Sequence, residues 1–122
     1  MKILKTKNNY LVSVVMNCYN GEKYLKEAIN SLLAQTYKNW ELIFYDNCST
    51  DKSKLIIKKY KDKRIYYFRS NKKHNLGLAR KRALAKAKGD FISFLDTDDI
   101  WKKNKIQKQI KSFDDTKIGF SI

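Results

Sequence analysis

Apolar segments of two kinds alternate along the chain. Short runs rich in β-branched or aromatic residues, typical of buried strands, cover residues 10–16, 40–45, 64–69 and 90–95. Between them lie longer stretches whose apolar residues recur every three or four positions, which is typical of amphipathic helices. They predict helices that begin near Glu22, run from Ser49 or Thr50 to about Tyr60, run from Leu76 to Lys88, and cover 101–113. The last residues, 117–122, are expected to begin another strand.

The first predicted helix shows how the two faces separate. Its expected buried face carries six apolar residues, which are Tyr24, Leu25, Ala28, Ile29, Leu32 and Leu33. Its expected outer face carries Lys23, Lys26, Glu27 and Asn30. Asn20 lies just before the helix and can cap it by accepting a backbone hydrogen bond.

Strands that alternate with helices favour an α/β fold with a mostly parallel sheet and helices on both faces, in the manner of a Rossmann-like nucleotide-binding domain. The chain has no proline, no internal repeat and no low-complexity stretch, so residues 1–122 are expected to form a single domain. In such sheets ligands bind beyond the carboxyl ends of the strands. The segments to inspect for chemistry are therefore NCYN, DNCSTD, SNKKHNLG and DTDD.

The net charge of +15, from 27 Lys and Arg against 12 Asp and Glu, favours anionic partners such as nucleotides, phosphorylated lipids, nucleic acid or a membrane surface. A solvated surface is the alternative explanation, because many lysines fall on predicted solvent faces of helices. Examples are Lys54, Lys58 and Lys61, and Lys102, Lys105 and Lys108. The charge therefore does not choose among these partners.

Cysteine usage and hydropathy restrict the compartment. Cys18 and Cys48 lack CxxC spacing and the chain has a single histidine, so neither a zinc site nor a redox pair is predicted and reduced thiols are expected. No run approaches the roughly 20 apolar residues of a membrane span, and no apolar signal-peptide core follows the first lysines. The expected location is the cytoplasm, with contact at the inner face of the membrane compatible with the charge.

The loop after the fourth predicted strand carries three carboxylates, Asp96, Asp98 and Asp99. Three neighbouring carboxylates repel one another unless a cation or water relieves them. A spacing of one residue lets two carboxylates meet one hard cation, and Mg²⁺ takes one or two carboxylates together with substrate phosphate oxygens. The alternative is a solvated turn whose aspartates cap the next helix.

The loops after the first two strands offer polar groups at strand ends. Tyr19 stands beside Asn17 and Asn20, and an aromatic ring in such a setting can stack on a base, although a surface or core aromatic is the alternative. Asp46 and Asn47 follow the second strand. The cluster Ser49, Thr50 and Asp51 is interpreted as structural, capping the next helix.

The loop after the third strand is basic. Lys72 and Lys73 precede His74, and Arg80, Lys81 and Arg82 follow within the predicted helix. These cations can meet phosphate charge at a helix start, although solvated cations are the alternative. His74 is interpreted as a loop residue.

Two stretches carry a resemblance to a known family, VSVVMNCYNGEKYLKEAINSLLAQTYKNWELIFYDNCSTDKS and NLGLARKRALAKAKGDFISFLDTDDIW. From about Val12 to its end, the chain resembles the family 2 glycosyltransferases, whose GT-A fold binds nucleotide sugars. The resemblance implies inverting transfer of a sugar from a nucleotide sugar, foremost a UDP-sugar, to a saccharide or lipid-linked acceptor. It also implies a divalent cation, Mn²⁺ or Mg²⁺, as cofactor.

The resemblance further implies roles for single residues. Asn17 and Tyr19 occupy the first nucleotide-binding loop, with Tyr19 against the base. The pair Asp46 and Asn47 replaces a frequent double aspartate, and Asn47 can accept a hydrogen bond from a uracil nitrogen only through its amide oxygen. Arg80 matches the arginine of an A-R-N segment and is expected near the diphosphate or base, although Lys81 replaces the asparagine.

The acidic loop corresponds to the D-x-D motif of the family. Asp98 would ligate the metal, and Asp96 would face the ribose and the water shell of the metal. Thr97, between them, belongs to the expected nucleotide-sugar site, and Asp99 is expected to cap or support the helix leading to Trp101.

The general base of the family, an acidic residue that deprotonates the acceptor hydroxyl, lies in a later segment than the D-x-D motif. The resemblance therefore places this base beyond Ile122, the last residue of the sequence. The chain is accordingly expected to stop before the acceptor-binding part.

Two alternatives stay open at this point. A non-catalytic fragment could bind nucleotide without turnover. A basic nucleic-acid-binding module would use the positive charge and the tyrosines, yet the acidic cluster lies where its ligand should bind. The expected partners are therefore a nucleotide-sugar donor and a glycan or lipid-linked acceptor, and no nucleic acid.

Overall fold

Strands and helices alternate throughout residues 9–116, which are the residues that this computed structural model describes. The elements are β1 (Val12–Cys18), α1 (Leu25–Leu33), β2 (Trp40–Asp46), α2 (Ser53–Lys58), β3 (Ile65–Arg69), α3 (Leu76–Leu84), β4 (Phe91–Phe94) and α4 (Lys105–Thr116). Each strand is followed by a helix, as the hydrophobic pattern predicts. The strand expected over 117–122, which would end at Ile122, lies outside the described residues.

The four strands form one parallel sheet in the order β3-β2-β1-β4. β1 and β2 pair along their whole length, from Val12 opposite Trp40 to Cys18 opposite Asp46. The chain winds outward from β1 to β3 and then returns to place β4 on the other side of β1. The carboxyl ends of β1 and β4 therefore flank the switch point, where open parallel sheets bind their ligands.

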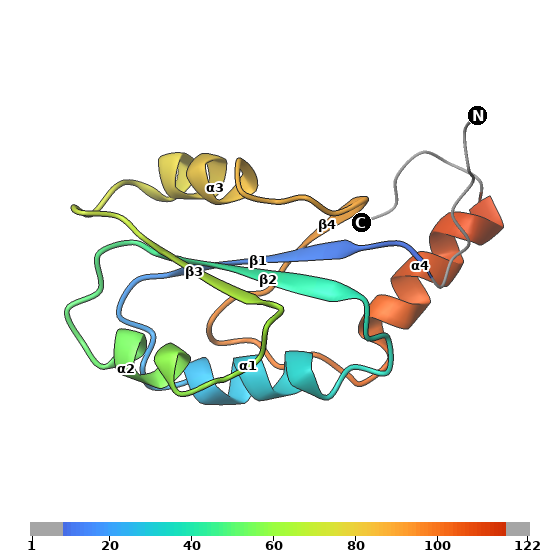
Figure 1. The fold of residues 1–122 in the computed structure, drawn as a ribbon, viewed down its shortest axis with the longest axis horizontal. Helices are drawn as coiled ribbons and strands as arrows, with labels where there is room; N and C mark the ends of the chain where they lie inside the picture. Colours follow the sequence, from blue (N-terminus) through green and yellow to red (C-terminus); the bar gives the residue numbers. More distant parts are fainter. Residues whose placement is uncertain (1–8, 117–122) are drawn as a thin grey trace.

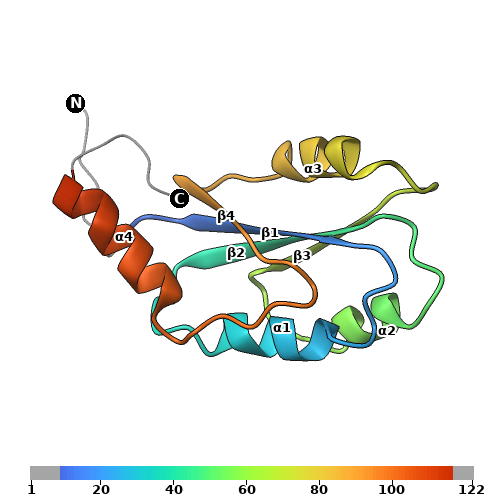
Figure 2. The ribbon, with the colours of Figure 1, turned by 180° about the vertical axis from the view of Figure 1, so that it is seen from behind.

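Helices cover both faces of this sheet, which confirms the predicted α/β class. Figures 1 and 2 show α3 on one face and α1 with α2 on the other. α4 packs beside the edge at which β1 and β4 begin, because Phe113 meets the rings of Tyr10 and Phe91 at 6.0 and 4.7 Å between ring centroids. The opposite edge, where the strands end, is left to the connecting loops. No helix within 9–116 has the length and apolar character that crossing a bilayer requires.

Alternation along the strands divides the core in two. The larger cluster lies between the sheet and α1, α2 and α4, and its largest fully buried side chains include Met16, Leu25, Leu42, Phe44 and Ile106. The smaller cluster lies under α3 and joins Val15, Ile43 and Tyr45 to Ala79 and Ala83. The two alanines allow α3 to lie close to the sheet. In both clusters, burial of each large apolar side chain contributes about 1.5–3 kcal/mol to the stability of the fold.

The predicted helix boundaries are wrong at several ends. α1 begins at Leu25 and leaves Tyr24 47% exposed, so Tyr24 does not belong to the buried face. α3 ends at Leu84, because the residues after it bond to the sheet. The N–H of Lys88 donates to the Glu41 carboxylate, and the N–H of Gly89 donates to the Ser13 hydroxyl. α2 is shorter than predicted at both ends.

α4 begins at Lys105, four residues later than predicted. The preceding residues are tied to the end of α1 by side chains that the hydrophobic pattern does not reveal. The N–H of Trp101 donates to Ser31 Oγ, and Gln35 Nε2 donates to the carbonyl of Lys102. Gln35 Oε1 then accepts from Ile106 N, in the first turn of α4. Asp99 consequently does not cap this helix, and its carboxylate accepts from the adjacent Ile100 N–H.

Candidate functional site

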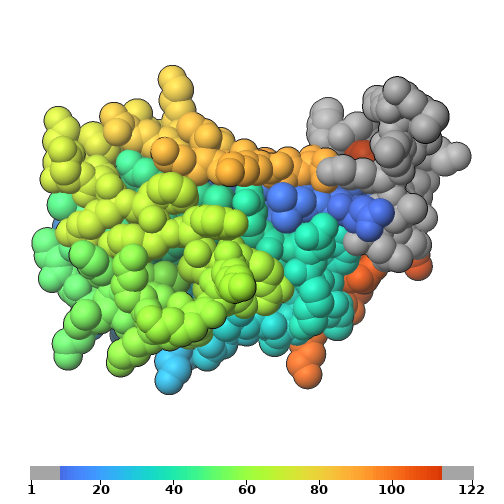
Figure 3. Space-filling view, viewed as in Figure 1, coloured from blue at the N-terminus to red at the C-terminus, as the bar shows by residue number. Residues whose placement is uncertain are grey.

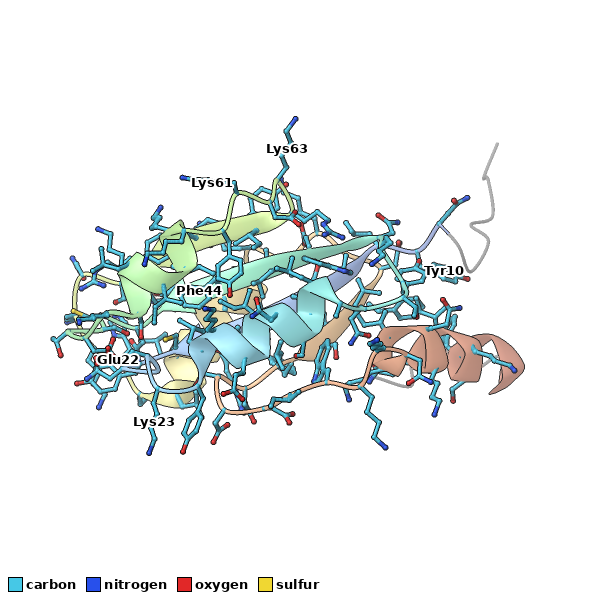
Figure 4. The ribbon with its side chains drawn as sticks, turned by 90° about the horizontal axis from the view of Figure 1, so that it is seen from below. Tyr10, Glu22, Lys23, Phe44, Lys61 and Lys63 are labelled. Atoms are coloured by element: carbon cyan, nitrogen blue, oxygen red, sulfur yellow. The ribbon has the colours of Figure 1, made fainter. Side chains whose placement is uncertain are left out.

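The loops that follow β1 and β2 are joined by reciprocal hydrogen bonds. Asn20 Oδ1 accepts from the N–H groups of Thr50 and Asp51 at 2.7 and 3.2 Å. In return, Asp51 Oδ2 accepts from Glu22 N and Ser53 Oγ accepts from Gly21 N, both at 3.0 Å. The predicted cap of α1 by Asn20 is thus wrong, because the side-chain oxygen of Asn20 accepts hydrogen bonds from the neighbouring loop instead. Figure 4 shows Glu22 at this edge.

Backbone geometry agrees with this exchange. Asn20 and Cys48 have φ values of 51° and 64°, a left-handed region that asparagine tolerates better than most side chains. Ser49 Oγ accepts from Asn20 N at 2.9 Å, which adds a further bond between the two loops. The predicted structural role of Ser49, Thr50 and Asp51 is confirmed: Asp51 Oδ1 accepts from Ser53 N at the start of α2, and the cluster also joins the two loops.

Asp46 ends β2 with a fully buried carboxylate whose oxygens both have protein donors. Oδ1 accepts from Ser49 N, and Oδ2 accepts from Tyr67 Oη at 2.7 Å and from Arg69 Nη1 at 2.8 Å. Burial, followed by the adjacent carboxylate, raises the pKa of Tyr67 to about 12. Asp46 therefore holds the end of β2 to Ser49, Tyr67 and Arg69. Its direct contact with nucleotide stays a prediction.

Asn47 is buried and joins the end of β2 to the loop after β3. Its Nδ2 donates to the carbonyl of His74 at 2.7 Å, and its Oδ1 accepts from the N–H of His74 at 2.9 Å. His74 is a loop residue, as predicted. Burial and then the charges of Arg82 and Lys72 lower the pKa of its imidazole, which marks this side of the site as electropositive.

A pocket of about 400 Å³ opens between these loops. Its lining comes from the ends of β1 and β2 and from the start of α3: Asn17, Cys18, Tyr19, Asn47, Lys73, His74, Asn75 and Leu76. Tyr19 is 43% exposed, and Lys73 Nζ lies 3.9 Å from the centre of its ring. Asn17 Nδ2 is buried and has no hydrogen-bond partner among the described residues. The pocket thus offers an aromatic face and donor groups.

Arg80 lies on the exposed side of α3, near the end of β4. Its guanidinium is 5.5 Å from the centre of the Phe94 ring, two residues before Asp96. α3 itself begins with a capping bond, in which Asn75 Oδ1 accepts from Leu78 N. This geometry brings Arg80 to the same edge of the sheet as the acidic loop.

The acidic loop follows the fully buried Leu95, whose N–H bonds to the carbonyl of Val15 in β1. Asp96, Asp98 and Asp99 are exposed, and Thr97 is half-buried. Thr97 contacts the loop after β1, because a Cβ added to Gly21 would lie 3.2 Å from Thr97 Oγ1. The loop after β1 and the acidic loop after β4 therefore approach each other at the switch point.

The acidic loop alone does not form a complete metal cage. Within the described part of the chain, no group of three or more His, Cys, Asp or Glu side chains could hold a metal ion. Asp96 and Asp98 offer hard carboxylate oxygens to solvent, and such oxygens suit Mg²⁺ or Mn²⁺ when substrate phosphate completes the coordination.

The two cysteines are free, and burial raises the pKa of the Cys18 thiol.

Several residues of this edge could not be recognised from the sequence. Lys73 shows its relation to Tyr19 only in three dimensions, and Tyr67 and Arg69 look like ordinary members of an aromatic strand. Ser31 and Gln35 hold the segment after the acidic loop from a helix about 70 positions earlier. No local sequence signal distinguishes them.

The expected general base cannot be located among the residues described above. Its predicted place is beyond Ile122, and Ile122 itself lies outside the described residues 9–116. The position of the base therefore stays a prediction.

Comparison with known proteins finds glycosyltransferases among similar sequences. The chain is 40% identical over 113 residues to the Escherichia coli UDP-Glc:alpha-D-GlcNAc-diphosphoundecaprenol beta-1,3-glucosyltransferase WfgD, an alignment that covers 93% of this chain and 45% of the relative. The chain thus spans somewhat under half the length of that relative.

Solved structures share the fold. S. aureus TarS 1-349 in complex with UDP-GlcNAc has a TM-score of 0.81 and 32% identity, over 85% of this chain and 31% of that one. The mannosyltransferase PcManGT from Pyrobaculum calidifontis, in complex with GDP-Man and Mn²⁺, has a TM-score of 0.80 at 20% identity, over 87% of this chain and 33% of that one. The second likeness concerns the fold alone.

The family comparison covers nearly the whole chain. The model of "Glycosyl transferase family 2" matches residues 13–122, which include every site residue discussed above. The chain therefore belongs to the family 2 glycosyltransferases.

Proposed function

We propose that this chain is the donor-binding part of an inverting glycosyltransferase that uses a nucleotide sugar, foremost a UDP-sugar, and a divalent cation. The observation that carries the proposal is that the Tyr19 pocket and the loop of Asp96 and Asp98 lie at the same edge of the sheet, where a Cβ added to Gly21, two residues after Tyr19, would lie 3.2 Å from Thr97. An aromatic pocket next to exposed carboxylates suits a ligand with a base at one end and a diphosphate at the other.

In this proposal different residues bind different parts of the donor. Asn17 and Tyr19 hold the base, while Asp46 and Asn47 support that pocket from the end of β2. Asp98 would ligate the cation, Asp96 would face the ribose and the water shell of the cation, and Thr97 would belong to the nucleotide-sugar site. The bound cation supplies neutralisation of the charge that develops on the leaving nucleoside diphosphate.

The transfer itself is a single displacement. The acceptor hydroxyl forms a bond to the anomeric carbon while the bond to the diphosphate breaks, so the configuration inverts. Arg80, at the end of β4, can stabilise negative charge on the leaving group. We assign the general base to none of the described residues and propose that it follows Ile122 in the whole protein. Residues 1–122 alone are proposed to bind the donor, whether or not they also transfer the sugar.

The names of similar proteins support the choice of donor and acceptor. WfgD is named for UDP-Glc and a diphosphoundecaprenol-linked sugar, and TarS was solved with UDP-GlcNAc. By extension we propose a glycan or lipid-linked acceptor for this chain, encountered at the cytoplasmic face of a membrane. The exposed acidic cluster at the binding edge argues against nucleic acid as the partner.

Calorimetric titration of the chain with UDP, with and without Mn²⁺, tests the proposal. Asp98→Asn should weaken the Mn²⁺-dependent binding at least about tenfold, because it removes an anionic ligand. Asp99→Asn is the matched control, since it removes the same charge from the same loop, and its carboxylate already accepts from Ile100 N. Equal losses in both variants, or binding indifferent to chelator, would refute the metal role.

A basic face could carry the membrane contact. Figure 3 looks onto α2, β3 and the connection between them, and Figure 4 shows Lys61 and Lys63 pointing away from the protein there. The α2–β3 face is defined here by five exposed residues: Lys54, Leu55, Lys59, Lys61 and Lys63. Asp62 is neutralised by Arg64 at 2.7 Å, and Leu55 is 62% exposed. Lysines around a protruding leucine suit an anionic lipid surface.

A further inference from the structure

Both polar atoms of the Asn47 carboxamide have a partner in the protein. They bond to the backbone of one residue, His74, and Asn47 is only 6% exposed. Asp46 beside it also has protein donors on both oxygens. At the end of β2, every side-chain oxygen of Asp46 and Asn47 therefore already accepts a hydrogen bond from the protein.

The pair of bonds ties the loop between β3 and α3, close to the start of α3, to the residue that follows β2. One end of the loop is held where Ser70 N donates to the carbonyl of Asp46, and the other where Asn75 caps α3. His74 is the point between them that is bonded to β2. The adjacent residue, Lys73, therefore lies over the Tyr19 ring. Its Nζ is 3.9 Å from the centre of that ring.

We propose that Asn47 is a positioning residue that fixes this loop, and that Lys73 is the residue through which the pocket selects its base. The inference rests on the proposed nucleotide-binding function. Lys73 Nζ can only donate hydrogen bonds, and the unpartnered Asn17 Nδ2 is also a donor. A pocket with these two donors selects a base edge built of carbonyl oxygens, as in uracil, over cytosine, which replaces one carbonyl with an amino donor.

Amide hydrogen exchange tests the positioning step without any nucleotide. In Asn47→Ala, the protection factor of the His74 N–H should fall about tenfold or more, because both bonds to its backbone are lost. Asn47→Asp keeps the acceptor but sets a carboxylate against the His74 carbonyl. Its loss of protection should reverse on acidification, when the protonated carboxyl can donate again. Asn39→Ala is the control, since Asn39 donates to two backbone carbonyls at the other edge of the sheet.

Affinities for UDP and CDP test the selection step. Wild type should prefer UDP, and Lys73→Met should lose most of that preference, roughly tenfold, while the protection of His74 stays unchanged. Lys72→Met, a change of the same charge one residue earlier, should keep the preference. Asn47→Ala should resemble Lys73→Met in binding but not in exchange.

Each contrary result has a distinct meaning. Unchanged His74 protection in Asn47→Ala would overturn the positioning role. An equal loss of UDP and CDP binding in Lys73→Met would overturn base selection and assign Lys73 to the diphosphate. Failure of wild type to bind any nucleotide would reject the proposed function and base selection with it, while the exchange data would still decide whether Asn47 fixes the loop.

Discussion

The backbone N–H of Trp101 donates a hydrogen bond to the hydroxyl of Ser31 at 3.1 Å, which fastens the chain leaving the acidic loop to α1. Ser31 in turn donates to the carbonyl of Ala28. The loop that carries Asp96 and Asp98 is thus anchored at both ends, by β4 before it and by α1 after it. Its geometry depends on side chains far from any ligand.

Gln35 is the most heavily bonded of these anchors, and Gln35→Ala should destabilise the fold by about 2–3 kcal/mol. The change leaves the N–H of Ile106 without its partner and removes one of the two donors to the carbonyl of Lys102, which still accepts from Lys105 N. Urea unfolding measures the loss, and Gln107→Ala, a change of the same kind on α4, should stay within about 0.5 kcal/mol of wild type. Indistinguishable losses would mean that water replaces Gln35 at little cost.

Gly89 should tolerate no side chain. A Cβ there would lie 2.6 Å from Ser13 N and Oγ and 2.7 Å from the carbonyl of Leu11, so Gly89→Ala should cost about 2 kcal/mol or more. Gly77→Ala is the control, because its nearest contact would be Asn75 Oδ1 at 3.5 Å and it lies within α3. That change should be neutral or stabilise by up to about 1 kcal/mol. Thermal unfolding of both variants decides; similar melting temperatures would contradict the close approach.

Stability should fall at alkaline pH through Tyr67. Its pKa is raised to about 12, by burial first and then by Asp46, so the folded chain holds this proton more tightly than the unfolded chain. The resulting stabilisation is complete below the unfolded pKa, about 10, and is lost as the pH rises through about 12. Tyr67→Phe should give a shallower decline over this range in urea unfolding, whereas Tyr24→Phe, which removes an exposed phenol, should not. Parallel declines in all three proteins would exclude Tyr67 as the cause.

Binding to anionic vesicles should depend on the α2–β3 face. Changing its four lysines to glutamate should abolish co-sedimentation with vesicles rich in anionic lipid, since each lysine near such a surface contributes about 1 kcal/mol. The control changes four exposed lysines elsewhere, Lys102, Lys103, Lys108 and Lys111, and alters the net charge equally. A similar loss in both variants would show that total charge, and not this face, drives the association. No binding by wild type would reject membrane contact.

The sequence predicted the fold well because hydrophobic periodicity is a local signal. Every predicted strand and helix within the described residues exists, and the loops named from strand ends do lie at one edge. The errors concern partners distant in sequence. Asn20 has the side chain of a helix cap but bonds to Thr50 instead, and the start of α4 is set by Gln35. Propensity cannot reveal which of several possible partners a polar side chain chooses.

The contacts within the candidate site are harder to predict for the same reason. The family pattern singled out Tyr19 and Asp98 in loops and Arg80 on a helix, yet it could not show that Asn47 is bonded to His74 or that Lys73 lies over the Tyr19 ring. Those relations depend on the path of the loop between β3 and α3, which contains no regular structure and no repeating pattern.

The strand order also constrains how the chain folds. β1 meets β2 after a separation of about 28 residues, but it meets β4 only after about 79, as the pairs Val12 with Trp40 and Val12 with Phe91 show. Closing the longer loop costs more chain entropy, so we expect β1, β2 and β3 to assemble before β4 docks. The acidic loop follows β4 directly. Affinity for a metal–nucleotide complex would then appear only in the last step of folding, and could serve as a kinetic reporter of its completion.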